Sequence, residues 1–455
     1  MQTIWARTVL TPQGWQQGAL IEIGDDGVIT GVSPNAKPGS APRFGTVVPA
    51  PVNLHSHGFQ RAMAGLTEAR GAQAADSFWT WRQLMYRFLD HLTPDDVHAI
   101  TAFAQMEMLQ AGFGSVCEFH YLHHQIDGAA YDNPAEMADS IVAAAQDTEI
   151  GLTMLPVLYQ VGGCDGRALG DGQRRFGSSI DRFAKLIDGT ATALSSLPPD
   201  ANLGIAPHSL RAVSPEGLGH AADLLPDAPF HIHVAEQTAE VKEVSAARGA
   251  RPVQWLLGEH DVNDRWCLIH ATQMTADETS ALAKTGATAG LCPETEASLG
   301  DGIFDGVRYL GAGGQFGLGT DSNIRISLAG EMRGLEYSQR LRDHGRALFA
   351  TADKSTGRCL WENISAGGAR AAGRLTGSIQ PGQLADMLAL DLHHPNLTGR
   401  SGDTALDTFV FAESQRMITD VWSAGRHVVK DGAHVRQGRI TARYIETITA
   451  LMARI

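Results

Sequence analysis

The sequence predicts an α/β protein: a (β/α)8 TIM-like barrel with a small β-sandwich built from both termini. Eight short apolar stretches alternate with helical stretches through the middle of the chain. Both ends instead carry short alternating segments broken by Gly, Asn and Pro, which is typical of β-meanders. An open doubly wound sheet is the alternative, but no glycine fingerprint follows the first predicted strand.

The predicted barrel strands are apolar almost throughout, as parallel strands covered by helices should be. In chain order they are residues 46–54, 115–119, 152–158, 203–207, 230–235, 266–270, 287–291 and 315–319. Helical stretches lie between them, for example at 96–110, 135–147, 178–195, 238–248 and 275–284. A barrel carries its active site at the carboxyl ends of its strands, so the residues there are the candidates for chemistry.

The two ends of the chain are expected to share the small domain. Residues 1–48 and 379–455 would supply its strands and a terminal helix, and residues 49–378 would form the barrel. The pair Asp431–Gly432 lies between two apolar runs, which predicts a tight hairpin in the second segment.

Composition restricts the partners of the protein. The 455-residue chain has 36 Lys and Arg against 50 Asp and Glu, a formal net charge of −14, which disfavours nucleic acid and anionic membranes. A small anionic substrate stays possible, because local arginines can outweigh the mean charge. Five scattered cysteines without a Cys-x-x-Cys pair indicate reduced thiols. No signal peptide and no apolar run of about 18 residues is present, so we expect a cytoplasmic protein.

Histidines gather at the ends of the predicted strands. His55 and His57 are two apart on an extended segment, so both imidazoles point to the same side. With His233 and Asp321 at later strand ends, three nitrogens and one carboxylate suit zinc, iron or manganese, with a water completing the shell. We expect one metal ion, because no lysine that could bridge two metals stands at a strand end. Three lysines fall in helical stretches: Lys185, Lys242 and Lys284.

Other histidines and one glutamate allow two interpretations. His231 shares a face with His233 one layer deeper, where a hydrogen-bonded core histidine is expected. Glu236 is either catalytic or a carboxylate in the first turn of a helix, and the adjacent metal cluster favours catalysis. A second metal site is the alternative for three histidines in a polar loop, where solvated side chains are the expected state: His120, His123 and His124.

With these residues the chain resembles the amidohydrolase superfamily over essentially its whole length. His55, His57, His233, His270 and Asp321 follow the superfamily's order on strands one, five, six and eight. Residues 377–391 (GSIQPGQLADMLALD) are similar to its small composite domain, and residues 231–236 (HIHVAE) to its mononuclear deaminases.

A narrower resemblance is to the formiminoglutamate deiminases. It rests on residues 55–66 (HSHGFQRAMAGL), 292–302 (CPETEASLGDG) and 319–325 (GTDSNIR). Guanine deaminases and triazine chlorohydrolases typically have Asn where this chain has Glu296. The resemblance implies a homodimer with one zinc per chain that converts N-formimino-L-glutamate to N-formyl-L-glutamate and ammonia in histidine degradation. It implies zinc ligands His55, His57, His233 and Asp321, a catalytic group of Glu236, His270 and Asp321, and substrate contacts Gln60, Arg82, Tyr121, His208 and Arg211.

Three alternatives stay open at this point. The first is a deaminase or chlorohydrolase of the same superfamily that acts on a heterocycle. The second is action on N-formimino-L-aspartate, because one methylene gives only about 1–3 kcal/mol of discrimination. The third is a catalytically inactive barrel that serves as an assembly subunit. Arg82 and Arg211 favour a substrate with two carboxylates, unless they form surface or loop salt bridges.

Overall fold

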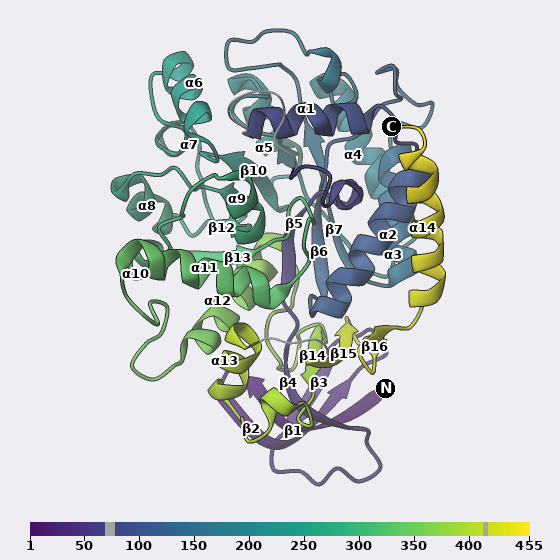
Figure 1. Cartoon of the computed structure of the whole chain (residues 1–455), viewed down its shortest axis with the longest axis vertical. Coiled ribbons are helices and arrows are strands. Elements are labelled where there is room, and N and C mark those ends of the chain that lie inside the picture. The colour runs from purple at the N-terminus through teal and green to yellow at the C-terminus, as the bar shows by residue number, and fades with distance from the viewer. Residues whose placement is uncertain (69–77, 413–416) are drawn as a thin grey trace.

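The computed structural model describes residues 1–68, 78–412 and 417–455. It consists of a barrel of parallel strands surrounded by helices, with a mixed sheet from both chain ends at the base (Figure 1). The predicted fold class is confirmed, and the eight barrel strands occur in the expected order.

The barrel strands form two parallel sheets that three isolated bridges join into a closed ring. One sheet has the order β5–β6–β7–β8, with β9 also beside β7, and the other has the order β10–β11–β12–β13. Ile205 pairs with Phe230 at one seam, and Ser56 pairs with Asp321 at the other. The strands are β5 (Val52–Ser56), β6 (Ser115–His120), β7 (Gly151–Leu158), β8 (Asn202–Leu203), β9 (Ala206–Pro207), β10 (Phe230–Val234), β11 (Trp266–His270), β12 (Thr288–Leu291) and β13 (Gln315–Leu318).

Helices cover the outside of the ring and one helix lies across its carboxyl end. Figure 1 shows α1 (Phe78–Leu89) across the top of the barrel. Two short 3-10 helices are η1 (Gly58–Met63) and η2 (Asp171–Gln173). The other helices of this part are α2 (Pro94–Ala111), α3 (Glu136–Thr148), α4 (Ile180–Leu194), α5 (Pro215–Leu224), α6 (Thr238–Arg248), α7 (Pro252–Glu259), α8 (Ala276–Ala283), α9 (Pro293–Leu299), α10 (Gly306–Gly311), α11 (Leu328–Asp343) and α12 (Thr356–Ala372).

Strands from both chain ends join in one eight-stranded sheet of order β17–β16–β15–β14–β4–β1–β2–β3. The two ends meet where β14 pairs antiparallel with β4. Asp431 and Gly432 form the predicted two-residue turn with φ of 51° and 75°. The strands are β1 (Gln2–Thr11), β2 (Gly14–Ile23), β3 (Ile29–Ser33), β4 (Arg43–Pro49), β14 (Met387–Leu390), β15 (Ile418–Ser423), β16 (Arg426–Lys430) and β17 (Ala433–His434); η3 (Pro395–Leu397) and α13 (Asp403–Phe411) lie between β14 and β15.

Two predicted strands are interrupted. The apolar run 46–54 is two strands in different sheets, because the chain passes from β4 to β5 at Ala50 and Pro51, and Pro51 has no N–H for a ladder. The run 203–207 is divided at Gly204, where an added Cβ would lie 2.7 Å from the Pro229 carbonyl oxygen. There the Ile205 N–H turns to Pro229 O, at 2.9 Å, on the neighbouring side of the barrel.

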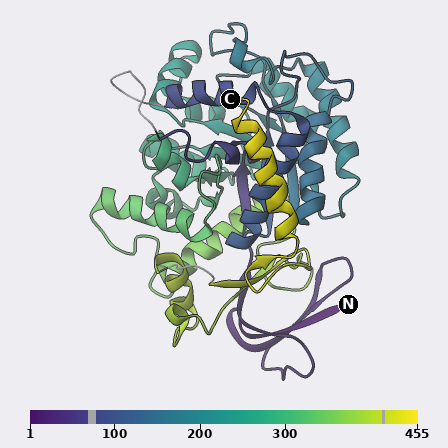
Figure 2. The ribbon, with the colours of Figure 1, turned by 45° about the vertical axis from the view of Figure 1, so that its right-hand side comes forward.

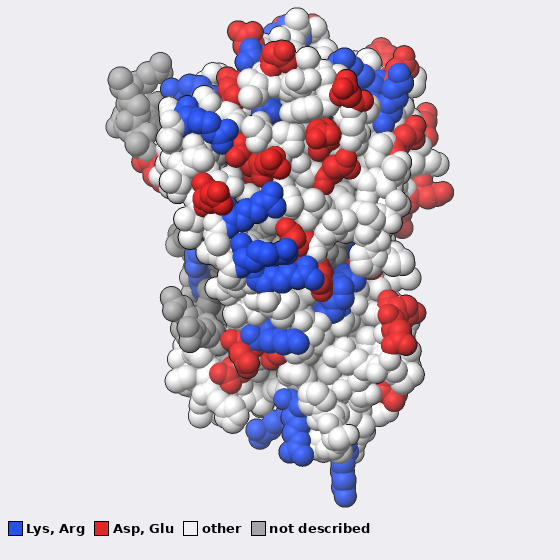
Figure 3. Space-filling view, turned by 90° about the vertical axis from the view of Figure 1, so that its right-hand side faces the viewer, with Lys and Arg blue, Asp and Glu red and all other residues white. Residues whose placement is uncertain are grey.

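The last helix, α14 (Gln437–Met452), runs along the outside of the barrel against α2 (Figures 1 and 2). Tyr444 stacks on Phe103 of α2 with ring centroids 3.9 Å apart. Lysine and arginine side chains gather on this face (Figure 3), and Arg439 pairs with Asp147 of α3 at 2.6 Å. Among the described residues, no helix combines the length and hydrophobicity that crossing a membrane requires.

Candidate metal centre and active site

Four of the predicted side chains meet at the carboxyl end of the barrel. His55 and His57 come from the end of β5, His233 from β10, and Asp321 from the segment after β13. The His57 and His55 Nε2 atoms lie 3.2 and 3.4 Å from Asp321 Oδ1. The Nε2 atoms of His233 and His55 are 3.1 Å apart, and all four side chains are buried.

The hydrogen bonds of two imidazoles orient their lone pairs toward this centre. His57 Nδ1 donates to Phe119 O at 2.8 Å, and His233 Nδ1 donates to His208 O at 3.0 Å, so their Nε2 atoms face inward as acceptors. Burial lowers the pKa of His55 to about 3 and also lowers the pKa values of His57 and His233. Three neutral nitrogens and one carboxylate are a donor set that fits a single divalent transition-metal ion.

The strand ends around this centre carry non-glycine residues with left-handed backbone. Ala235, His270, Ala271 and Asp321 have φ of 52°, 68°, 48° and 44°. Such values are uncommon outside glycine, and they persist where the surrounding structure holds them. Around Asp321 the backbone is held by Asn323, whose side chain donates to the backbone oxygens of His57 and Asp321 at 3.2 and 3.1 Å. The rim is therefore a fixed frame for the side chains.

A second group of side chains can exchange protons beside this centre. His270 Nε2 lies 3.9 Å from Glu236 Oε1 and 3.9 Å from Asp321 Oδ2. Burial raises the pKa of Glu236. Burial alone would lower the pKa of His270, but the carboxylates of Glu236, Glu296 and Asp321 raise it to about 10. Glu236 precedes α6 rather than lying in its first turn, so the helix-terminus interpretation does not apply.

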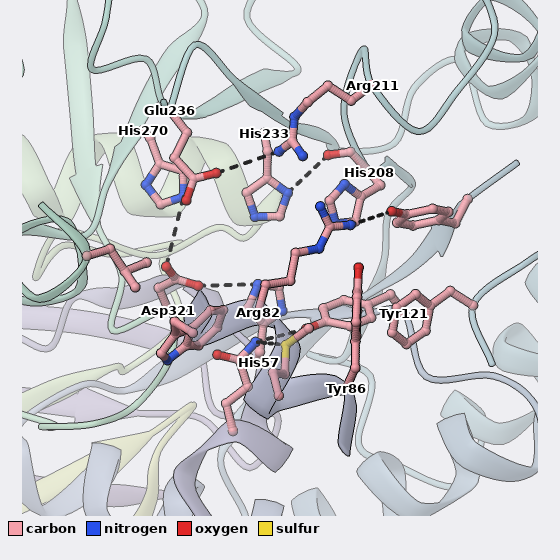
Figure 4. Close-up of a pocket in the computed structure, with 16 residues that line it drawn as sticks. His57, Arg82, Tyr86, Tyr121, His208, Arg211, His233, Glu236, His270 and Asp321 are labelled. Atoms are coloured by element: carbon pink, nitrogen blue, oxygen red, sulfur yellow. Dashed lines mark hydrogen bonds and ion pairs between the residues drawn. The ribbon is translucent and has the colours of Figure 1, made fainter. Parts of the chain in front are cut away.

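Both predicted arginines line the same pocket (Figure 4). Arg82, on α1, donates from Nη2 to the Tyr159 hydroxyl at 2.8 Å. Arg211, after β9, is 6% exposed, and its Nη2 and Nε lie 3.8 and 3.9 Å from carboxylate oxygens of Glu236 and Glu240. Arg211 therefore forms its ion pairs inside the pocket and not on the surface.

The three remaining predicted contacts also line the pocket: Gln60, Tyr121 and His208. Gln60 Nε2 donates to the Tyr121 hydroxyl at 2.8 Å. Gln60 Oε1 is buried and has no hydrogen-bond partner in the part of the chain that the structure describes. The pocket thus offers one acceptor for an N–H group beside two cations.

The sequence profile of the amidohydrolase family matches residues 46–428. This chain belongs to the amidohydrolase family. The resemblance inferred from the strand-end histidines is thereby confirmed.

Individual amidohydrolase relatives narrow the comparison. The chain is 43% identical to formimidoylglutamate deiminase of Pseudomonas aeruginosa, over 99% of this chain and 100% of that one. It is 28% identical to 5-methylthioadenosine/S-adenosylhomocysteine deaminase of Natronomonas pharaonis, over 77% and 74% of the two chains. The crystal structure of an amidohydrolase from Brucella melitensis superposes with a TM-score of 0.96 at 45% identity, covering 99% and 100%. A zinc-bound adenosine deaminase from Xanthomonas campestris has a TM-score of 0.82 at 21% identity, covering 99% and 98%, and shares the fold.

Six residues of the amidohydrolase pocket were not singled out from the sequence, and Glu296 was noted only as a position where related enzymes have Asn. The Glu296 carboxylate lies 3.2 Å from His270 Nδ1, a contact that its sequence motif did not indicate. Tyr159 directly follows β7, so the strand-end rule could have found it, and Tyr86 lies one helical turn after Arg82. The others on the pocket wall are Trp81, Met85, Phe176 and Leu299.

The remaining histidines of the amidohydrolase barrel lie outside the metal cluster. His231 Nε2 lies 2.7 Å from Ala371 O, which confirms the predicted core role. The expectation that three loop histidines are solvated is wrong, since His120, His123 and His124 are 1%, 2% and 7% exposed. His120 is the last residue of β6, and the backbone N–H groups of His123 and His124 donate to Arg175 O. Two groups of side chains among the described residues could hold a metal ion, His55–His57–His233 and His55–His270–Asp321, and the three histidines belong to neither.

Proposed function

We propose that this amidohydrolase hydrolyses N-formimino-L-glutamate to N-formyl-L-glutamate and ammonia in histidine degradation. The observation that carries the proposal is that Arg82 and Arg211 line one pocket with the histidine–aspartate cluster. The substrate has two carboxylates and an imine carbon, and guanidinium groups bind carboxylates through paired hydrogen bonds. The similarity to the Pseudomonas formimidoylglutamate deiminase supports the same reaction, since formimidoyl and formimino name one group.

One zinc ion per chain is proposed at His55, His57, His233 and Asp321, with iron and manganese as the alternatives for this donor set. Such an ion lowers the pKa of a water bound to it from about 15.7 toward about 7. The neutral, inward-facing imidazoles and the buried carboxylate support this assignment.

Proton transfer is assigned to three side chains. Asp321 and His270 would orient the attacking water and accept its proton as the water oxygen adds to the formimino carbon. Glu236 would deliver a proton to the imino nitrogen, so that the C–N bond breaks and ammonia leaves. The raised pKa of Glu236 favours the protonated form that this role requires.

The remaining pocket residues would hold the glutamate part of the substrate. Arg82 and Arg211 would bind its carboxylates, and Gln60 Oε1 would accept an N–H group. Tyr121 and His208 would close the sides of the pocket, so that the imine carbon is held in position for attack.

Assembly and organisation are part of the proposal. The resemblance supports a cytoplasmic homodimer. We assign residues 1–48 and 379–455 to the small domain and 49–378 to the barrel, because β4 ends at Pro49 and β14 begins at Met387.

The test is ammonia release from N-formimino-L-glutamate by zinc-loaded protein, with N-formyl-L-glutamate identified as the co-product. We expect a chelator to abolish the release and zinc to restore it. N-formimino-L-aspartate, guanine and S-adenosylhomocysteine are the competing substrates. A larger kcat/KM on any of them, or no release from metal-replete protein, would contradict the proposal.

A further inference from the structure

Two tyrosine hydroxyls lie on either side of the Arg82 guanidinium. Tyr86 is four residues after Arg82 on α1, and the guanidinium carbon lies 5.2 Å from its ring centroid. Tyr159 follows β7, and its hydroxyl oxygen is 2.8 Å from Arg82 Nη2. Figure 4 shows the Tyr86 side chain rising toward the Arg82 guanidinium within the pocket. Neither tyrosine belongs to the substrate contacts that the sequence resemblance implies.

The Tyr159 oxygen accepts two hydrogen bonds, which leaves its own proton for a ligand. Gln173 Oε1 accepts from the Gly170 N–H at 2.9 Å, so Gln173 Nε2 faces Tyr159 and donates to it at 2.7 Å. The Arg82 guanidinium can only donate hydrogen bonds, so the Tyr159 oxygen also accepts the bond from Arg82 Nη2. No acceptor for the Tyr159 O–H is found among the described residues, and this side chain is only 2% exposed.

The Tyr86 hydroxyl is in a similar state. Its oxygen is buried and has no hydrogen-bond partner among the described residues. Burial raises the pKa of Tyr86, so the group keeps its proton and stays a donor. A buried donor left without an acceptor destabilises the protein. Two such donors beside a guanidinium are matched to an anion with several acceptor lone pairs.

We propose that Arg82, Tyr86 and Tyr159 form a clamp for the side-chain carboxylate of the substrate, with the two hydroxyls donating directly to its oxygens. This inference rests on the proposed function. We assign the α-carboxylate to Arg211, because that arginine lies 3.8 Å from Glu236, the proposed proton donor to the imino nitrogen. In the substrate the imino nitrogen is joined through the formimino carbon and the amine nitrogen to the carbon that carries the α-carboxylate. The side-chain carboxylate lies two bonds further from the imino nitrogen than the α-carboxylate does, and it therefore reaches the Arg82 end of the pocket.

Deleting each hydroxyl alone tests the clamp. In Tyr86→Phe and Tyr159→Phe we expect KM for N-formimino-L-glutamate to rise about tenfold, with kcat within about twofold, because a hydrogen bond to a charged group is lost. The matched control is Tyr309→Phe, which deletes an equally buried hydroxyl that donates to Ala287 O at 3.0 Å in the barrel wall. Its KM should stay at the wild-type value. An unchanged KM in either pocket variant overturns the three-donor clamp.

Two truncated substrates identify the carboxylate. 4-(Formimino)aminobutanoate keeps the side-chain carboxylate and lacks the α-carboxylate, and both pocket variants should lose about tenfold in kcat/KM on it. N-formimino-L-2-aminobutyrate lacks the side-chain carboxylate, and the variants should equal the wild type on it. An equal loss on both analogues overturns the assignment, since a general distortion of the pocket would act on both.

Calorimetric titration of glutarate into zinc-loaded protein separates this inference from the proposed function. The absence of ammonia release from N-formimino-L-glutamate by the wild type would refute the function, whereas the titration requires no turnover. We expect glutarate to bind about tenfold more weakly to each pocket variant than to Tyr309→Phe. Equal affinities overturn the clamp whatever the reaction is.

Discussion

The carboxylate of Glu296 lies 3.2 Å from Nδ1 of His270, on the side of the imidazole that faces away from Glu236 and Asp321. The same Glu296 oxygen accepts the Cys292 N–H at 2.9 Å, so the start of α9 fixes its position. Glu296 therefore sets the ring orientation of His270 without lining the pocket, which makes it a positioning residue.

Glu296→Gln tests this relationship. We expect kcat for ammonia release to fall about 10- to 100-fold, as for other partners that orient a catalytic imidazole, while KM and bound zinc stay near wild-type values. Glu294→Gln, on the same helix, is the control, because Glu294 pairs with Arg325 at 3.0 Å instead. Equal activities of the two variants in a steady-state assay would remove the positioning role.

His233→Ala and His231→Gln separate a metal ligand from a core histidine two residues away on β10. His233→Ala should bind less than a tenth of the wild-type zinc, measured by elemental analysis after dialysis, because one of four donors is lost. His231→Gln can still donate to Ala371 O and should keep full zinc with a modestly lower Tm. Full zinc stoichiometry in His233→Ala would refute the ligand assignment.

Asp200→Asn tests the contact between the barrel and the small sheet. Asp200 pairs with Arg374 at 3.1 Å and with Arg426 of β16 at 2.7 Å. Breaking such a buried network should destabilise the protein by about 3–5 kcal/mol at pH 7, measured by denaturant unfolding. Asp188→Asn, on the exposed face of α4, should change stability by less than about 0.5 kcal/mol.

Asp200 should also make the stability of the protein depend on pH, in a direction that its pKa defines. Burial alone would raise the pKa of Asp200, but the two arginines lower it below the usual 3.8. The stabilisation is therefore complete above pH 3.8 and is lost as the pH falls below that value through the folded-state pKa. The difference in the free energy of unfolding between wild type and Asp200→Asn should therefore become smaller as the pH falls below 3.8. If this difference in unfolding free energy stays constant until the protein unfolds in acid, the charge of Asp200 is not what stabilises the wild type.

Arg211→Met should raise KM for N-formimino-L-glutamate at least 100-fold, because a bidentate charged contact is lost. Arg211→Met should also bind N-formimino-L-2-aminobutyrate more weakly than the wild type does, but should equal the wild type on 4-(formimino)aminobutanoate. The two tyrosine variants should show the opposite pattern. Arg265→Met, whose guanidinium donates to Ala222 O at 2.8 Å away from the pocket, is the control. The same loss on both analogues would argue that Arg211 only neutralises Glu236 and Glu240.

The barrel and its metal cluster could be predicted because they follow from local patterns. Strand periodicity and the rule that strand ends meet bring His55, His57, His233 and Asp321 together without any knowledge of packing. The break at Ala50 and Pro51 could not be predicted, because an apolar run does not reveal which sheet each half joins. The donor count at Tyr159 was equally hidden, because it depends on the amide orientation of Gln173, which only a hydrogen bond to Gly170 defines.

The seam between β5 and β13 has a consequence for biogenesis. Across it, the backbone N–H groups of Asp321 and His57 bond to the oxygens of His55 and Asp321, both at 2.9 Å. The chain thus delivers two candidate ligands with its first barrel strand and another only after its last. The ribosome must synthesise about 70% of the polypeptide, through residue 321 of 455, before the ion-binding pocket can exist. A truncated nascent chain should acquire no zinc, so metal uptake reports completion of the ring rather than its early growth.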